Sequence, residues 1–346
     1  MSGKRVLSTW IVLDDLATES RYPQAGRISS ADPRVHALYW RCVAVFFAVA
    51  RRASGSGHTL RLYTNRAENL AHAIPELAAI LDAAQVEVKI VPFEHVPPPG
   101  YYGHWRNQFY ILDLLREMAD GDGEEAHIVL DSDSLCLYPI APVFEALESK
   151  GALTIITGEP PGQLINGLTR EQMKEIFEEL AQCRIDGLPE YLGGEFFAAT
   201  SQTVRAMLPV AENAWNRSIE RFHAGKIKFN EEAHLLSYLY WRLGIEEGSA
   251  DQFVKRVWTG IHYQNGVPED VHKLIVHVPS EKRFGYVELF KLVRDSSSWF
   301  YLEKDDQVWR KRIQRMMGVP RPSLPKQAVE FLTYGVGRLQ RLAGSK

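Results

Sequence analysis

The feature that most constrains the fold is a repeated alternation of short β-rich runs with helical patterns in the first 150 residues. The β-rich runs cover residues 6–13, 60–64, 86–93 and 127–130. Segments with helical periodicity follow them at 36–52, 68–83, 104–119 and 143–149. Strands that alternate with helices of this length require right-handed crossovers, which place the strands in a mainly parallel sheet. The alternation therefore predicts a doubly wound α/β unit.

The second half of the chain contains further strands and helices. We predict strands at 152–158, 195–200 and 274–278, and helices at 169–181, 203–223 and 231–243. Two amphipathic helices, 308–317 and 327–342, lie on either side of a proline-rich segment. The chain is therefore expected to form an α/β body with a C-terminal helical extension.

The composition excludes several other classes of protein. The chain has 346 residues, of which 45% are hydrophobic and 24% charged, so it is neither disordered nor fibrous. Cys42, Cys136 and Cys183 lack zinc-ligand spacing, and we expect them to be buried apolar side chains in a reducing cytoplasm. The apolar run 6–13 is too short to span a membrane. The net charge of −3 disfavours binding to nucleic acid.

The sharpest chemical signal is Asp131-Ser132-Asp133, directly after the predicted strand 127–130. Open α/β sheets bind ligands at the carboxyl ends of their strands. Two carboxylates one residue apart repel each other, so a site that holds them together is expected to contain a cation, and oxygen ligands suit Mg²⁺ or Mn²⁺. These ions also bind phosphate oxygens, which implies a phosphate ester or diphosphate substrate. The alternative is a chance occurrence of the triplet in an acidic turn.

The order of the surrounding features extends this interpretation. The triplet follows a helix that carries a basic residue, and it precedes a small-residue strand, an acidic helix start, and a strand ending in a histidine with a lysine shortly after. The segments are 105–115, 128–133, 192–200, 229–236 and 275–282. In these features the chain resembles the GT-A class of nucleotide-sugar-dependent glycosyltransferases, most nearly the glycogenin-like members of glycosyltransferase family 8, over about residues 4–290.

The resemblance implies a GT-A fold, with a mainly parallel central sheet flanked by helices. Residues 1–290 would form the catalytic domain, with a nucleotide-binding half (1–133) and an acceptor half (134–290), and residues 291–346 would form the helical extension. It also implies a metal-dependent glycosyltransferase that moves a sugar from a nucleoside-diphosphate sugar to a glycan or lipid-linked acceptor. UDP-sugars are the favoured donors.

By the same resemblance, Asp131, Asp133 and His277 would bind Mn²⁺ or Mg²⁺, and Lys282 would neutralise the leaving diphosphate. Positive charges at these places stabilise the transition state, because negative charge accumulates on the departing diphosphate. A histidine on a strand is also common in a protein core, which is the alternative interpretation of His277.

Further donor-binding residues are expected around the cation. Ser132 lies between the two aspartates, and Arg106 follows an aromatic loop at the start of a helix. Trp10 or Tyr102 would stack on the nucleobase. The alternatives are a solvated helix charge for Arg106 and core packing for the two aromatic residues.

Three carboxylates are candidates for deprotonating the acceptor hydroxyl, which requires a pKa raised by burial or by a neighbouring charge. Glu195 begins an apolar strand after two glycines that would let a ligand approach the backbone. Glu231 and Glu232 are equally explained as acidic residues in the first turn of a helix.

The C-terminal extension is strongly basic. Residues 310–346 contain nine Lys/Arg and a single acidic residue, Glu330. The simpler interpretation is two helices packed on the domain with their basic side chains in water. The alternative is peripheral contact with anionic lipid headgroups at the inner face of the membrane.

Two other functions share parts of this pattern. A phosphatase of the haloacid-dehalogenase class also uses an Asp-x-Asp motif after a strand, here Asp131 and Asp133. A GT-A scaffold that binds nucleotide sugars without turnover would keep the same fold. Metal-dependent stabilisation by UDP would separate a nucleotide-sugar site from a phosphatase.

Overall fold

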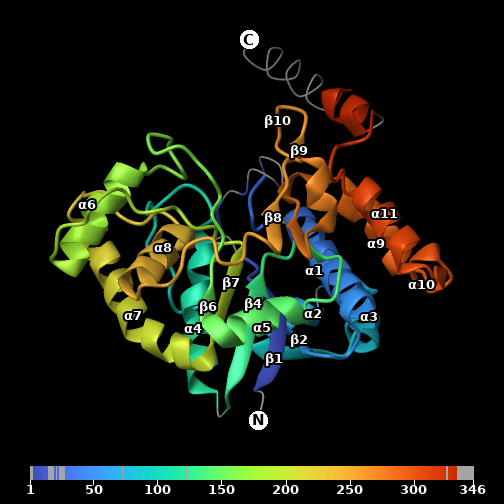
Figure 1. Ribbon diagram of the computed structural model, residues 1–346, viewed down its shortest axis with the longest axis horizontal. Helices are drawn as coiled ribbons and strands as arrows, with labels where there is room; N and C mark the ends of the chain where they lie inside the picture. Colours follow the sequence, from blue (N-terminus) through green and yellow to red (C-terminus); the bar gives the residue numbers. More distant parts are fainter. Residues whose placement is uncertain are drawn as a thin grey trace.

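The computed structural model describes residues 3–14, 19–20, 22, 28–71, 73–121, 123–324 and 326–332. Its centre is a six-stranded mixed sheet in the order β3-β2-β1-β4-β7-β6, with helices on both faces (Figure 1). The strands are β1 (Lys4–Ile11), β2 (Thr59–Thr64), β3 (Val86–Ile90), β4 (Glu125–Leu130), β6 (Ala152–Leu153) and β7 (Phe196–Thr200). The first four run parallel to one another, whereas β7 runs antiparallel to β4 and β6. The predicted α/β fold with a mainly parallel sheet is confirmed.

The helices form two layers that enclose this sheet. Figure 1 shows α1, α3, α9 and α11 on one side of the molecule and α4, α6, α7 and α8 on the other. The helices are α1 (Pro33–Ser54), α2 (Glu68–Ala71), α3 (Leu77–Ala83), α4 (Tyr110–Asp120), α5 (Ala141–Lys150), α6 (Arg170–Ala181), α7 (Ser201–His223), α8 (Glu232–Arg242), α9 (Gly285–Val293), α10 (Trp299–Leu302) and α11 (Asp306–Met316). Short 3₁₀ helices are η2 (Arg106–Phe109), η3 (Pro268–His272) and η4 (Pro279–Glu281).

The side chains along each strand point alternately into two hydrophobic cores, one on each face of the sheet. In β4, Ile128 and Leu130 belong to the core that contains the buried residues of α1, whereas Val129 belongs to the core that contains those of α4. Successive side chains of a strand point to opposite faces, so a strand covered on both faces is mostly apolar. This explains the uninterrupted apolar run before Asp131.

The order of the strands creates a place for a ligand. β2 and β3 lie on one side of β1, whereas β4 lies on the other. At such a reversal the loops that leave neighbouring strands diverge and open a crevice at the carboxyl ends. Residues 12–14 follow β1 and residues 131–133 follow β4, so both loops border this crevice.

A smaller sheet continues directly from the large one. It consists of β5 (Ser134–Cys136), β11 (Ile275–His277) and β8 (Val254–Arg256), in the order β5-β11-β8. Only three residues separate β4 from β5, and the N–H of Ser134 donates to the carbonyl of Asp131 at 2.9 Å, which closes a tight turn. A hairpin of β9 (Thr259–Gly260) and β10 (Tyr263–Gln264) follows β8.

In two of the predicted helices a single residue interrupts or delays the helix. The segment 68–83 is divided into α2 and α3, because Pro75 has no N–H and its ring interrupts the helix. The helix predicted from residue 104 begins as η2 at Arg106. Trp105 has a φ of 48°, in the left-handed region, so no right-handed helix can pass through it.

Some of the predicted strands are longer than the observed ones. The strand predicted at 86–93 ends at Ile90 because Pro92 cannot donate to a neighbouring strand. The strand predicted at 152–158 ends at Leu153, since the next N–H, that of Thr154, donates to the side chain of Ser249. The strand predicted at 274–278 is β11 and belongs to the smaller sheet.

The remaining predictions on the chain as a whole have mixed outcomes. Cys42 and Cys136 are buried as expected, but Cys183 is exposed, because it follows the end of α6. Residues 326–332 are helical, and the rest of the helix predicted at 327–342 lies outside the described residues. Within the described ranges, no helix is both long and apolar enough to cross a lipid bilayer.

Candidate metal centre and its cavity

Three potential metal ligands converge where the chain leaves the large sheet. Asp131 and Asp133 lie in the turn between β4 and β5, and His277 ends β11, where it pairs with Ser134 of β5. His277 Nε2 lies 3.0 Å from Asp133 Oδ2 and 3.8 Å from Asp131 Oδ2. One potential ligand atom of each residue lies within 4.8 Å of the others, so the group could hold a metal ion.

Backbone hydrogen bonds fix this turn from both sides. The N–H of Asp131 donates to the carbonyl of Glu195 at 3.1 Å, just before β7. The N–H of Val278 donates to the carbonyl of Asp133 at the same distance, just after β11. The positions of the two aspartates are therefore set by three strands from distant parts of the sequence.

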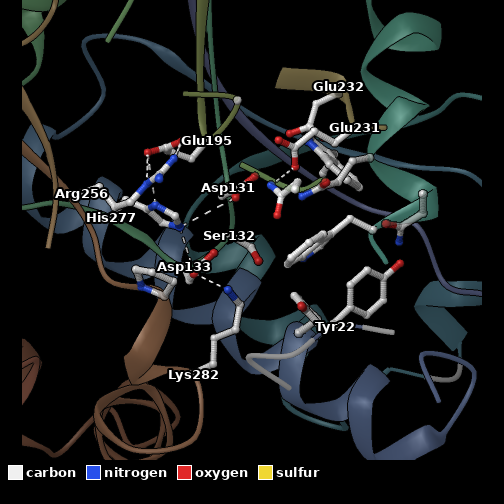
Figure 2. A pocket seen from close by; sticks show the side chains of 18 of the residues that line it. Tyr22, Asp131, Ser132, Asp133, Glu195, Glu231, Glu232, Arg256, His277 and Lys282 are labelled. Atoms are coloured by element: carbon white, nitrogen blue, oxygen red, sulfur yellow. Dashed lines mark hydrogen bonds and ion pairs between the residues drawn. The ribbon is translucent and has the colours of Figure 1, made fainter. Parts of the chain in front are cut away.

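A row of buried charges passes through the cluster. Lys282 Nζ donates to Asp133 Oδ2, on which His277 also converges (Figure 2). On its other side, the imidazole Nδ1 lies 3.7 Å from Glu195 Oε1. Arg256 binds the Glu195 carboxylate through two hydrogen bonds, of 2.6 and 2.5 Å. The signs alternate along the row, so each buried ion has a neighbour of opposite charge.

This row gives the two aspartates different protonation behaviour. Burial and the charge of Asp133 raise the pKa of Asp131 to about 6. Burial also acts on Asp133, but the charges of Lys282 and His277 outweigh it and hold the pKa of that carboxyl well below its usual range. Burial alone would lower the pKa of His277, yet the charge of Asp133 raises it to about 9. Asp133 is thus a fixed anion, while Asp131, with 30% of its side chain exposed, borders the cavity.

A second acidic pair lies at the start of α8. Glu231 accepts hydrogen bonds from the hydroxyl of Tyr191 at 2.7 Å and from the amide of Asn166. Burial raises the pKa of Glu231 to about 7, although both hydrogen bonds act in the opposite direction. Glu232 Oε2 is buried and has no hydrogen-bond partner among the described residues. Burial and the charges of Glu231 and Asp131 raise the pKa of Glu232 well above its ordinary value.

The two glycines before β7 make room for these carboxylates. A Cβ added to Gly194 would lie 2.3 Å from Glu232 Oε1, and one added to Gly193 would lie 2.5 Å from Glu195 Oε2. A Cβ atom does not approach a carboxylate oxygen this closely in a protein. Only glycine therefore fits at both positions without displacement of a carboxylate. The glycines were expected to admit a ligand, and in the structure they admit the protein's own acidic side chains.

These groups line one cavity of about 340 Å³ at the crevice between β1 and β4. The aspartates and Glu232 border it together with aromatic residues, which are Trp10, Tyr22, Tyr39, Trp105, Tyr191 and Trp258. The loop over residues 159–166 supplies another wall. A partly aromatic cavity with a few convergent charged groups is typical of a small-molecule site.

Most of the residues singled out in the sequence meet at this cavity. Its lining includes Trp10, Asp131, Ser132, Asp133, Glu195, Glu231, Glu232, His277 and Lys282. Tyr102 and Arg106 do not line it. The ring of Tyr102 packs against Gly167, and the Arg106 guanidinium donates to the carbonyl of Pro97 at 2.8 Å.

Sequence reasoning missed several groups of this site. Arg256 lies on a strand of three residues, which is too short to show periodicity. Glu159, which lies 3.4 Å from Arg256, and Asn166 belong to the loop between β6 and α6, outside the segments that carry the resemblance. Tyr191 lies just before the two glycines, and nothing near it in sequence indicates that its hydroxyl donates to Glu231.

Comparison of the chain with models of known protein families finds no match, and comparison with curated proteins finds no matching sequence. The structure itself therefore supports the conclusion that this is an α/β protein with a buried Asp131/Asp133/His277 cluster able to hold a metal ion.

Proposed function

We propose that the protein is a metal-dependent glycosyltransferase of the GT-A class. It transfers a sugar from a nucleoside-diphosphate sugar, with UDP-sugars favoured, to a glycan or lipid-linked acceptor. The single observation that carries this proposal is the Asp131/Asp133/His277 cluster at the edge of a cavity, placed where the strand order of the sheet reverses.

The donor set fits a divalent cation that also binds phosphate oxygens. Two carboxylates and one imidazole leave positions for substrate oxygens and water around Mn²⁺ or Mg²⁺. When bound there, the cation would supply positive charge to the departing diphosphate. Asp131, the more exposed aspartate, and Asp133, the fixed anion, would hold it together with His277.

Lys282 is the cation of this chain best placed beside the diphosphate. It lines the cavity and its ammonium contacts Asp133, so it lies next to the proposed metal ligands. Arg256 is different, because its guanidinium is held by Glu195 and lies 3.4 Å from Glu159. We assign Arg256 and Glu195 to the positioning of His277, and Lys282 to contact with the donor.

The three candidate bases differ in how their surroundings shift the pKa of each carboxyl group. Burial would raise the pKa of Glu195, but the charges of Arg256 and His277 hold it well below its usual range, which makes this carboxylate a weak base. Burial raises the pKa of Glu231 to about 7, and burial with the charges of Glu231 and Asp131 raises that of Glu232 well above its ordinary value. A group with a pKa near the working pH is the most effective proton acceptor. Glu231 is therefore the proposed acceptor of the proton from the attacking hydroxyl, and Glu232 a hydrogen-bonding group beside it.

A donor-hydrolysis screen tests this proposal. The protein would be incubated with UDP-, GDP- and CMP-sugars with Mn²⁺ or with EDTA, and released nucleotide would be measured. We expect metal-dependent release with one donor class, and a loss of at least about 100-fold in Asp131→Asn, because removal of one such charge-stabilising group costs two to three orders of magnitude. The Asp131 carboxylate is partly exposed and lies no closer than 3.8 Å to His277, so this variant should fold.

The control and the alternatives are part of the same experiment. Asp295→Asn removes an exposed carboxylate beyond α9 and should leave release unchanged. Equal release by the wild type and Asp131→Asn would contradict the proposal. Metal-dependent thermal stabilisation by UDP without any release would instead identify a binding scaffold, and hydrolysis of p-nitrophenyl phosphate would identify a phosphatase.

A further inference from the structure

The C-terminal part of the described chain exposes an unusual amount of apolar surface. Among the described residues, half of the exposed large apolar side chains lie between residues 301 and 332. Three of them are exposed by 65% or more: Leu324, Phe331 and Leu332. Isolated apolar residues are common on protein surfaces, whereas a contiguous apolar patch marks a face that contacts another phase or partner.

A groove of about 880 Å³ runs through this region. One wall is the face of α11 that carries Val308, Lys311, Arg312 and Arg315, whose spacing places them along one side of a helix. The other walls come from α9 and from residues 323–329. Apolar side chains line the groove together with the basic ones; they are Phe284, Val287, Trp299, Val308, Met316 and Val329. The exposed Leu324, Phe331 and Leu332 flank the groove-lining Lys326 and Val329 in the same segment of the chain. We call this surface the C-terminal face.

The charge of this face is positive. Five basic side chains line the groove against two acidic ones, Glu281 and Glu288. Both acids are already paired, with Lys326 and Lys291 respectively. Among the described residues, Lys311 and Arg315 are exposed and form no ion pair. The surplus of positive charge is thus available to an anionic partner.

The C-terminal face adjoins the wall of the candidate metal centre. Lys326 Nζ donates to the carbonyl and to the hydroxyl of Thr259, at 2.9 Å each, and to the buried Glu281. Glu281 immediately precedes Lys282, which contacts Asp133. Figure 1 shows the helical segment after α11 beside the β9–β10 hairpin. A surface bound here would lie close to the cavity.

We propose that the C-terminal face docks on an anionic lipid surface, with the exposed apolar side chains inserted between headgroups and the basic side chains against them. Combined apolar insertion and electrostatic attraction is the physical basis of peripheral membrane binding. Charge complementarity selects this occupant, because a second copy of the chain packed through the same face would bring the same excess of basic residues. The inference does not rest on the proposed glycosyl transfer.

Vesicle flotation with the full chain tests the proposal. We would compare vesicles of pure phosphatidylcholine with vesicles that contain 30% phosphatidylglycerol, at 20 and at 500 mM NaCl. Binding is expected only to the anionic vesicles and only at low salt. Each basic side chain near such a surface contributes about fivefold, so Lys311→Gln with Arg315→Gln should lower the partition coefficient about 30-fold. Phe331→Ser with Leu332→Ser should lower it about tenfold or more.

Two controls make the result decisive. Arg184→Gln with Lys226→Gln removes equal charge after α6 and α7, on the far side of the molecule (Figure 1), and should keep wild-type binding. Asp131→Asn should also keep wild-type binding to vesicles. A failure of the proposed sugar transfer can therefore be distinguished from a failure of membrane binding. Absence of binding to anionic vesicles, or equal loss in the control pair, would overturn the proposal. So would a concentration-dependent dimer that Phe331→Ser with Leu332→Ser dissociates, because the face would then be covered by a second copy.

Discussion

Replacement of Arg256 by methionine should destabilise the protein far more than replacement of another arginine with similar hydrogen bonds. Arg256 binds the carboxylate of Glu195 through two hydrogen bonds, and only 3% of the Glu195 side chain is exposed. The variant would leave a buried carboxylate without its strongest partner, which costs about 3–5 kcal/mol. The matched control is Arg5→Met. Arg5 also binds a carboxylate twice, that of Glu148, but both side chains are a quarter or more exposed, so the loss is about 0.2–1 kcal/mol.

Urea unfolding followed by circular dichroism measures both losses, and the midpoint of each variant gives the comparison. A third variant, Arg256→Met with Glu195→Gln, removes both charges and should recover most of the stability lost in Arg256→Met, because no uncompensated ion remains. The reasoning would be refuted if Arg256→Met and Arg5→Met had equal midpoints, or if the double variant were no more stable than the single one.

Two further predictions concern the acidic pair. Gly194→Ala should lower the free energy of unfolding by about 1–3 kcal/mol, because its Cβ would overlap the carboxylate of Glu232, whereas Gly121→Ala, with its nearest atom at 3.7 Å, should leave the urea midpoint almost unchanged. The pH profile of sugar transfer tests Glu231. Its raised pKa of about 7 means that the proton acceptor is lost as the pH falls, so the rate should drop about tenfold per pH unit below pH 6. A variant Glu231→Gln that kept the same acidic limb would show that another group is titrating.

The first half of the fold could be predicted because its signals are local. The strands β1 and β4 are rich in apolar residues, although Ser8 and Thr9 interrupt the run in β1, and the helices between them have a clear period. The bounds were missed where a single residue changes the backbone, as at Pro75 and Trp105. The smaller sheet was not foreseen, because three-residue strands carry no pattern and their pairing depends on distant parts of the chain.

Some residues of the candidate site could be predicted from the sequence and others could not. Asp131 and Asp133 were recognisable from one strand and its end. Placing His277 beside them relied on a resemblance, since nothing near it in sequence shows that β11 pairs with β5. Arg256 was missed because its role depends on the register that sets it beside His277. Tyr102 and Arg106 were placed by residue type alone, and the aromatic loop directs them elsewhere.

The three-residue turn between β4 and β5 has a mechanical consequence. The main chain crosses from the large sheet to the small one there, so the same residues join two otherwise separate hydrogen-bonded frameworks. A metal ion bound by Asp131, Asp133 and His277 would link the two sheets and oppose their separation. Amide hydrogen exchange in β5, β8 and β11 should therefore slow together when manganese is added, while exchange at the outer edge in β3 stays the same.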